Sequence, residues 1–227
     1  MLEANYAVIY IAEPRAVDVI PVLGRILGGI EGYVETGALT IIEPRIFFSA
    51  DTECTILFKQ WEKLFEMKRT NRFAGAVAVG MLGDLFFDQS NHHSKVIDYE
   101  SILAQRLPEN VQFVCGYLTE WLDKLSLAHL IALLDKHDGS LRRDFTISPL
   151  QRLKLVEAIR NVLAKKLDAE TAELIFDTFR LVYKLRDTDI VSQPDKFVDK
   201  LGKLLGEAAS RIIIESLRQE LLTIVSL

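Results

Sequence analysis

The sequence predicts an α/β domain built on a mostly parallel sheet flanked by helices, followed by a separate all-helical domain. In the first part of the chain, short apolar runs rich in β-branched residues alternate with helical patterns, as in βαβ units. After about residue 145, amphipathic helical patterns follow one another and no strand-like run appears. We therefore expect an α/β domain over residues 1–144 and a helical domain over residues 145–227.

Four apolar runs are the predicted strands of the α/β domain. Tyr6–Ala12 is continuously apolar, as expected for a strand buried on both faces of a parallel sheet. The later runs are Leu39–Ile42, Ala74–Val79 and Val111–Tyr117. Helical patterns separate all four runs, so consecutive strands should be joined by crossover helices.

Capping residues, prolines and helical spacing mark where the helices should begin. A proline fits the first helical turn, and Ser, Thr, Asp or Asn fits the position before it. In the α/β domain the predicted helices begin at Pro14, at Ser49 or Asp51, at about Ser94 and at Ser126. In the helical domain they begin at Ser148, where Ser148-Pro-Leu-Gln151 has the form of a capping box, and at Asp168, Pro194 and Gly206.

Composition and charge narrow the class of protein. The 27 basic and 32 acidic residues give a net charge of −5, so the chain lacks the basic surface expected of a nucleic-acid-binding protein. No apolar run approaches the roughly 20 residues that cross a bilayer, and the N-terminus lacks the features of a secretory signal. Cys54 and Cys115 both lie in apolar patterns, which suits a reducing compartment. We expect a cytoplasmic protein with no membrane partner.

The motifs of common α/β enzymes are missing. A phosphate-binding loop of the form Gly-x-x-x-x-Gly-Lys-Ser/Thr should follow the first strand, but Glu13-Pro-Arg15 stands there. No dinucleotide fingerprint, nucleophile elbow, paired-cysteine site or His-Glu-x-x-His motif is present. We therefore assign no catalytic residue, cofactor or metal, and expect a protein that is not an enzyme.

One polar cluster has residue types that can bind a metal. It consists of Asp84, Asp88, His92, His93 and Asp98. Their spacing matches no established ligand pattern, and adjacent histidines at a helix start are usually solvated. We expect no metal site there.

Polar and charged residues follow all four predicted strands, at the edge where open parallel sheets bind ligands. The candidate ligand-binding residues are Glu13, Arg15, Glu43, Arg45, Gly83, Asp84 and Tyr117. Because the carboxyl ends of parallel strands meet at one edge of the sheet, we expect these residues to border a single site.

The first 140 or so residues resemble the DcmR-type sensory domain of methanogens and methylotrophs, a degenerate relative of the KaiC/RecA-like ATPases. The stretches that carry the resemblance are Tyr6–Ala12, Gly37–Ile42, Ala76–Gly80 with Gly83-Asp84, Ile97–Glu100, Val114–Tyr117 and Leu133–His137. The resemblance implies a domain that senses a small molecule without hydrolysing nucleotide. The tail from Pro194 to Ala209 resembles an archaeal C-terminal helical domain of unknown function, which implies an archaeal source.

These observations favour a non-catalytic sensory or regulatory protein that binds a small ligand or a protein partner at the strand carboxyl ends. A divergent RecA/KaiC-like ATPase and a purely structural interaction module are the alternatives. We also expect a homodimer, because the apolar residues of the last predicted helix span more than one narrow stripe. Those residues are Ile212, Ile213, Ile214, Leu217, Leu221, Leu222 and Ile224.

Overall fold

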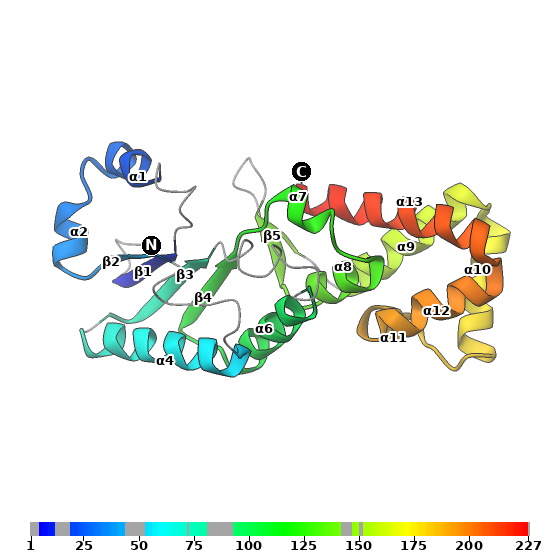
Figure 1. Cartoon of the computed structure of the whole chain (residues 1–227), viewed down its shortest axis with the longest axis horizontal. Helices are drawn as coiled ribbons and strands as arrows, with labels where there is room; N and C mark the ends of the chain where they lie inside the picture. The colour runs from blue at the N-terminus through cyan, green and yellow to red at the C-terminus, as the bar shows by residue number, and fades with distance from the viewer. Residues whose placement is uncertain are drawn as a thin grey trace. The chain divides into compact units, whose positions relative to one another are not determined.

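The structure is a computed structural model that describes residues 5–11, 19–43, 53–71, 73–80, 93–141, 147–149 and 152–226 (Figure 1). The chain divides into two units, Met1–Leu118 and Thr119–Leu227. The division comes earlier in the chain than the boundary at 144/145 that the sequence predicts. Helix α8 (Leu127–Leu134) causes this difference, because it packs against α12 (Pro194–Leu205) and α13 (Glu207–Ser226) of the helical unit.

A four-stranded parallel sheet forms the first unit, in the order β2-β1-β3-β4. The strands are β1 (Tyr6–Ile11), β2 (Leu39–Ile42), β3 (Gly75–Gly80) and β4 (Val111–Cys115). They coincide with the four predicted apolar runs to within a residue or two, and the predicted α/β class with a helical C-terminal region is confirmed.

Residues of β1 alternate between two levels of burial. Ala7, Ile9 and Ile11 are fully buried, whereas Tyr6 and Tyr10 on the other face are partly exposed. The prediction of complete burial on both faces therefore holds for one face only.

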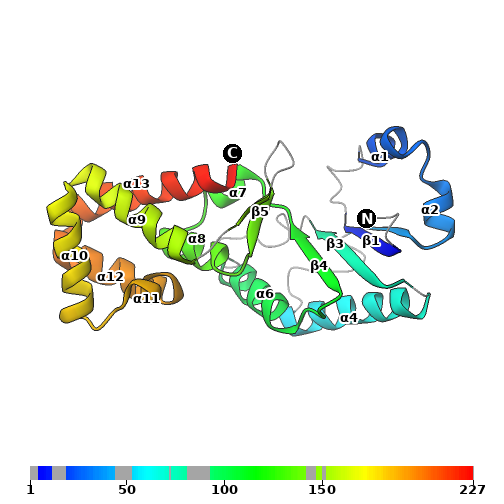
Figure 2. The same cartoon turned by 180° about the vertical axis from the view of Figure 1, so that it is seen from behind.

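Two helices cover one side of this sheet, as Figures 1 and 2 show: α4 (Cys54–Thr70) and α6 (His93–Arg106). Trp61 of α4 is fully buried and donates a hydrogen bond from Nε1 to Tyr99 Oη of α6, at 2.7 Å. The Trp61 ring also meets Phe113 of β4 edge to face, with 4.7 Å between ring centroids. This aromatic group anchors α6 beside the carboxyl half of β4.

Two further helices of the first unit, α1 (Val19–Leu27) and α2 (Glu31–Glu35), come between β1 and β2 in the chain. The predicted start of the first helix at Pro14 lies outside the described residues, and so do the predicted caps Ser49 and Asp51. The predicted helix from about Ser94 is α6.

Over its described residues, the second unit is helical apart from one small sheet. Its helices are α7 (Thr119–Leu122), α8, α9 (Arg152–Lys166), α10 (Ala169–Leu181), α11 (Asp187–Ser192), α12 and α13. Ser126 and Asp168 cap α8 and α10 as predicted, accepting hydrogen bonds from the backbone amides of His129 and Thr171. Among the described residues, no helix combines the length and apolar character that a membrane span requires.

The predicted helix start at Ser148 is wrong. Strands β5 (Gly139–Leu141) and β6 (Ile147–Pro149) pair antiparallel, with Ser140 opposite Ser148. The pairing holds the backbone at Ser148 extended, so α9 begins only at Arg152. The capping pattern depends only on residues 148–151, whereas the strand that pairs with Ser148 lies earlier in the chain, around Ser140.

Helix α13 buries most of the apolar residues that motivated the predicted homodimer. Ile213, Leu217, Leu221 and Leu222 are buried, and α13 packs against α7, α8, α9 and α12 of its own unit. Ile214 and Ile224 are partly exposed, and Ile212 is exposed over 65% of its surface.

Candidate functional site

The carboxyl ends of the four strands lie level at one edge of the sheet. Ile11 of β1 is in register with Ile42 of β2 and with Gly80 of β3, and Gly80 is in register with Cys115 of β4. The chain crosses from β2 on one side of β1 to β3 on the other, so the strand order reverses between β1 and β3. Ligands of open parallel sheets bind at such a reversal, outside the strand carboxyl ends.

Two of the seven predicted ligand-binding residues fall in the part of the chain that the structure describes. Glu43 is exposed and directly follows β2, and Tyr117 follows β4. Since β1 and β3 separate these two outer strands, three strand spacings of about 4.8 Å place them roughly 14 Å apart, and they do not meet. Glu13, Arg15, Arg45, Gly83 and Asp84 lie outside the described residues.

The structure describes only two of the five residues of the polar cluster whose residue types can bind a metal. Asp84, Asp88 and His92 lie outside the described residues. His93 and Asp98 are both on α6, but five residues apart, which turns them to different faces of the helix. These two side chains therefore do not form a pair.

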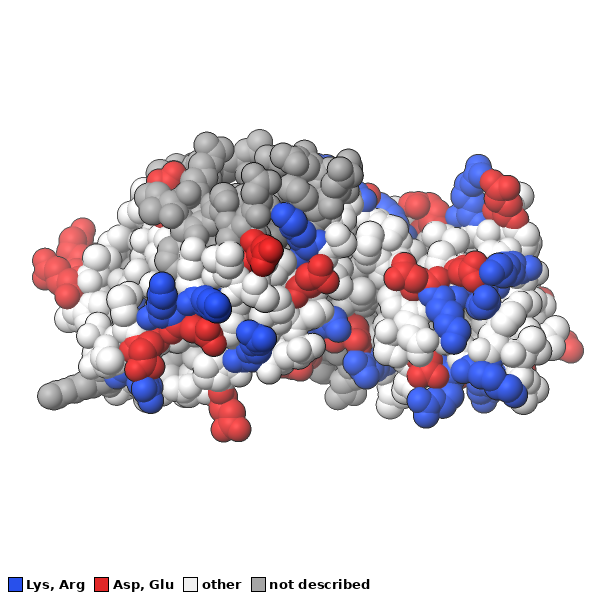
Figure 3. Space-filling view, turned by 60° about the horizontal axis from the view of Figure 1, so that its bottom comes forward, with Lys and Arg blue, Asp and Glu red and all other residues white. Residues whose placement is uncertain are grey.

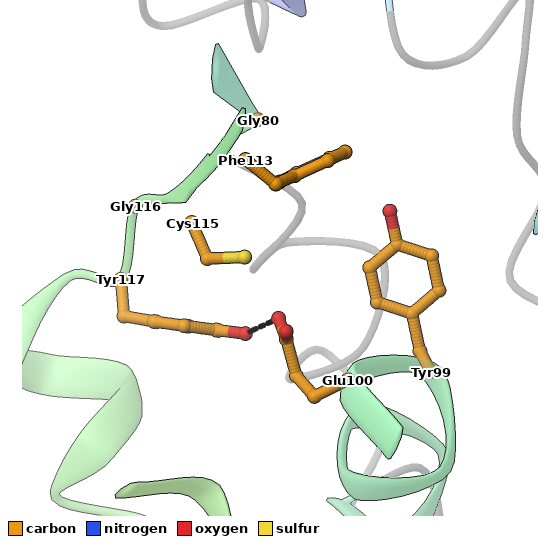
Figure 4. Close-up of a pocket in the computed structure, with 7 residues that line it drawn as sticks. All are labelled: Gly80, Tyr99, Glu100, Phe113, Cys115, Gly116 and Tyr117. Atoms are coloured by element: carbon orange, nitrogen blue, oxygen red, sulfur yellow. Dashed lines mark hydrogen bonds between the residues drawn. The ribbon is translucent and has the colours of Figure 1, made fainter. Parts of the chain in front are cut away.

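Tyr117 belongs to a polar group that the sequence analysis did not find, shown in Figure 4. Its hydroxyl donates a hydrogen bond to Oε1 of Glu100, a residue of α6 whose surface is only 3% exposed. Cys115, from the end of β4, and Tyr99, from α6, point into the same space. We call Tyr99, Glu100, Cys115 and Tyr117 the carboxyl-edge cluster.

A sequence signal for Glu100 exists. The buried face of α6 consists of Val96, Tyr99, Glu100 and Leu103. Residues three and four apart share one side of a helix, so Glu100 is a carboxylate within an otherwise apolar stripe. An acidic residue at such a position is almost always partnered, and here the partner is Tyr117, which follows β4.

Burial raises the pKa of the acidic groups around Glu100. The pKa of the Cys115 thiol lies well above its ordinary value because the thiol is buried and because Glu100 is close. The pKa of the Tyr117 phenol is raised well above its ordinary value for the same two reasons. The pKa of Tyr99 is also raised, chiefly by burial. At neutral pH the thiol and both phenols are therefore protonated, and they can donate hydrogen bonds.

The space inside the cluster is small. Its volume is about 10 Å³, which is about the least that holds one water molecule. It is lined by Gly80, Tyr99, Glu100, Phe113, Cys115, Gly116 and Tyr117. A protonated thiol is a poor nucleophile and a protonated phenol is a poor base, so the arrangement is suited to hydrogen-bonding a small polar group.

A roomier hollow lies at the opposite, amino edge of the sheet. Its volume is about 400 Å³, within the range of ligand pockets, and it is bordered by the second half of α4 and by the starts of β3 and β4. Glu62, Glu66 and Arg69 stand at its border, and Glu66 pairs with Arg69 at 2.7 Å. No sequence motif pointed to this hollow.

Lys68 also borders this amino-edge hollow, and its side chain is occupied by structural contacts. It is 5% exposed and donates hydrogen bonds from Nζ to the Gly37 carbonyl oxygen, at 2.6 Å, and to Thr40 Oγ1. Burial lowers the pKa of this lysine. The contacts tie the end of α4 to the segment that enters β2.

Charge is distributed unequally between the two units. Met1–Leu118 holds 10 basic and 15 acidic residues, and Thr119–Leu227 holds 17 of each, so the first unit carries the whole net charge of −5. On the face shown in Figure 3, basic and acidic side chains are intermingled. The described residues of that face form no broad basic surface of the kind that follows a nucleic-acid backbone.

The chain was compared with models of protein families, with curated proteins and with solved structures, and none of the three comparisons found a match. What the site does is therefore inferred from its own residues.

Proposed function

We propose that the protein is a non-catalytic sensory or regulatory protein that receives a small ligand at the carboxyl edge of its parallel sheet. The observation that carries the proposal is the carboxyl-edge cluster, in which a buried carboxylate meets protonated donors next to the strand ends. A cluster of this kind recognises a small polar group by hydrogen bonds. The resemblance to the DcmR-type sensory domain points to the same role.

The protonation of the cluster supports binding over catalysis. A catalytic thiol needs a lowered pKa to form thiolate, but burial and Glu100 raise the pKa of Cys115. A general base at neutral pH needs a pKa near 7, and the pKa of Tyr117 is raised above a value that is already higher. Neither group is prepared for nucleophilic or base chemistry.

Two alternatives remain as proposals of lower rank. A divergent RecA/KaiC-like ATPase would need a group that neutralises phosphate charge after β1, where the sequence has Glu13-Pro-Arg15 in place of a lysine-containing loop. A purely structural interaction module is favoured by the small volume of the cluster, about 10 Å³. A cytoplasmic location, an archaeal source and a homodimeric state belong to the leading proposal.

Ligand-dependent stabilisation tests the proposal, because a ligand that binds only the folded state raises the melting temperature. Protein purified from its own cells would first be examined by native mass spectrometry for a bound small molecule. That molecule, or a hit from a metabolite library, would then be added to wild-type protein and to Glu100→Gln, Tyr117→Phe and Glu62→Gln variants. Glu62 is the control because it borders the amino-edge hollow and not the cluster.

We expect the shift in melting temperature to be lost in Tyr117→Phe and Glu100→Gln and kept in Glu62→Gln. Tyr117→Phe is the safer variant, since it removes one hydroxyl and retains the ring. A shift that disappears only in Glu62→Gln would place the ligand at the amino edge and overturn the proposal. Magnesium-dependent ATP turnover above background would support the ATPase alternative instead.

A further inference from the structure

Helix α10 carries an apolar stripe on the side opposite its buried face. Leu174 and Leu181 are 65% and 70% exposed, and we call them the α10 stripe. Leu174 and Leu181 are seven residues apart, which is two helical turns, so they lie on one side of the helix. The buried residues of the same helix are Ala172, Ile175, Phe176 and Phe179.

Helix α10 is an outer helix of its unit in both Figure 1 and Figure 2. Single exposed apolar side chains are ordinary on a protein surface, but two exposed leucines on one side of a helix form a small apolar patch that a partner can cover. The occupant of this face can be argued from the charges at its two ends.

We propose that the α10 stripe is a homodimer interface, and that its partner is the same helix of a second copy of this chain, packed antiparallel. The inference rests on the homodimeric part of the proposed function and moves the interface from α13 to α10. Two-fold pairing is the commonest symmetry of soluble oligomers, and it makes each helix cover the stripe of the other.

Charge complementarity selects the antiparallel arrangement. Within α10 and its unit, Asp177 pairs with Arg180 at 2.5 Å, and Glu173 pairs with Arg160. Among the described residues, exposed Glu170 before the stripe and exposed Lys184 after it have no ion-pair partner. An antiparallel pair sets the acidic end of each helix against the basic end of the other, whereas a parallel pair sets like charges together.

The register follows from the stripe itself. Placing Leu174 of one copy opposite Leu181 of the other centres the two-fold axis between residues 177 and 178 and brings residue 170 level with residue 185. Lys184, which follows the end of the helix, is then at about the level of the partner's Glu170. Because the contact covers only about two to three turns, the area is small, and we expect a dissociation constant in the micromolar range.

Light scattering on full-length protein at about 1 to 100 µM measures this equilibrium. The wild type should approach twice the chain mass of 25.7 kDa at the high end. Leu174→Glu and Leu181→Glu should each weaken dimerisation by at least about tenfold. Ile212→Glu is the matched control, since Ile212 is equally exposed at 65% but lies on α13, and it should leave the dissociation constant unchanged.

Charge reversal tests the orientation. Glu170→Lys and Lys184→Glu should each weaken the dimer about two- to fivefold, and the double variant should restore it. A monomeric wild type at about 100 µM, or equal weakening by Ile212→Glu, would overturn the α10 interface. A double variant weaker than both single variants would overturn the antiparallel pairing. Circular dichroism of each variant shows that it is folded, and none of these outcomes involves the ligand.

Discussion

Replacing Gly75 by alanine should strain the start of the sheet. A β-carbon at this position would lie closer than 3.0 Å to the carbonyl oxygen of Asn110 and to the ring of Tyr6. The Asn110 oxygen accepts a hydrogen bond from the Ala76 amide at 3.1 Å, so it cannot turn away without loosening the pairing of β3. Tyr6 is directly opposite Gly75 in β1, so β1 is pushed as well.

The expected loss follows from the kind of atom that must move. Forcing extra atoms into a packed region costs about 1–3 kcal/mol, and a backbone neighbour on one side favours the upper end. For a chain of this size each kcal/mol lowers the melting temperature by about 2–4 °C, so a loss of about 3 kcal/mol means about 6–12 °C. Because total stability is about 5–15 kcal/mol, this single methyl group would remove a large share of it.

Differential scanning calorimetry measures the change, and Gly24→Ala is the matched control. A β-carbon at Gly24, in α1, meets no atom within 4 Å. Alanine is a better helix former than glycine by about 1 kcal/mol, so this variant should melt at the wild-type temperature or above it. A Gly75→Ala protein that melts within about 1 °C of wild type would falsify the close packing assigned to β3.

Four further substitutions have directions that the structure determines. Burial lowers the pKa of Lys68 below 10.5, the ordinary value that applies in the unfolded chain. Between these two pKa values the unfolded state binds more protons than the folded state, so the free energy of unfolding rises with pH. Lys68→Met should abolish this rise. Burial and the nearby Glu100 raise the pKa of Tyr117 well above 10, its ordinary value. Above pH 10 the folded state therefore binds more protons than the unfolded state, and the free energy of unfolding falls as pH rises. Tyr117→Phe should flatten this fall. Arg160 pairs with Glu173 and Asp187, and its guanidinium carbon lies 3.9 Å from the centroid of the Phe176 ring. Arg160→Met removes all three contacts and should lower the free energy of unfolding by about 1–3 kcal/mol. Arg211 is the matched control, because its side chain is 78% exposed and pairs only with Glu207 among the described residues. Arg211→Met should lower the free energy of unfolding by less than about 0.5 kcal/mol.

Urea unfolding at a series of pH values checks the first two substitutions, and unfolding at one pH checks the arginine pair. An unchanged pH slope in Lys68→Met would mean that its amine titrates equally in both states. The same result for Tyr117→Phe would mean that the phenol is not held by burial and Glu100. Equal losses in the two arginine variants would contradict the structural role of Arg160.

Local patterns predicted the elements of this fold well where local chemistry decides them. The apolar runs placed all four parallel strands, since a strand in a parallel sheet needs mostly apolar residues whatever its neighbour is. Ser126 and Asp168 cap helices as predicted, because a cap bonds to a backbone amide only three residues away. Ser148 shows where such patterns fail: the local capping pattern predicted a helix start, but Ser148 pairs with Ser140 in an antiparallel strand.

The sequence by itself determined the class of the two units and the positions of the four parallel strands, because burial patterns and caps depend on residues that are close in the chain. Only the tertiary structure decided which residues meet at the candidate site. Glu100 lies on a helix and Tyr117 lies just after a strand, and their contact depends on how α6 lies beside the end of β4. Similarly, packing against four neighbouring helices covered the apolar face of α13 and left the stripe of α10 exposed. Such choices arise from competition among distant surfaces for burial, which no single stretch of sequence records.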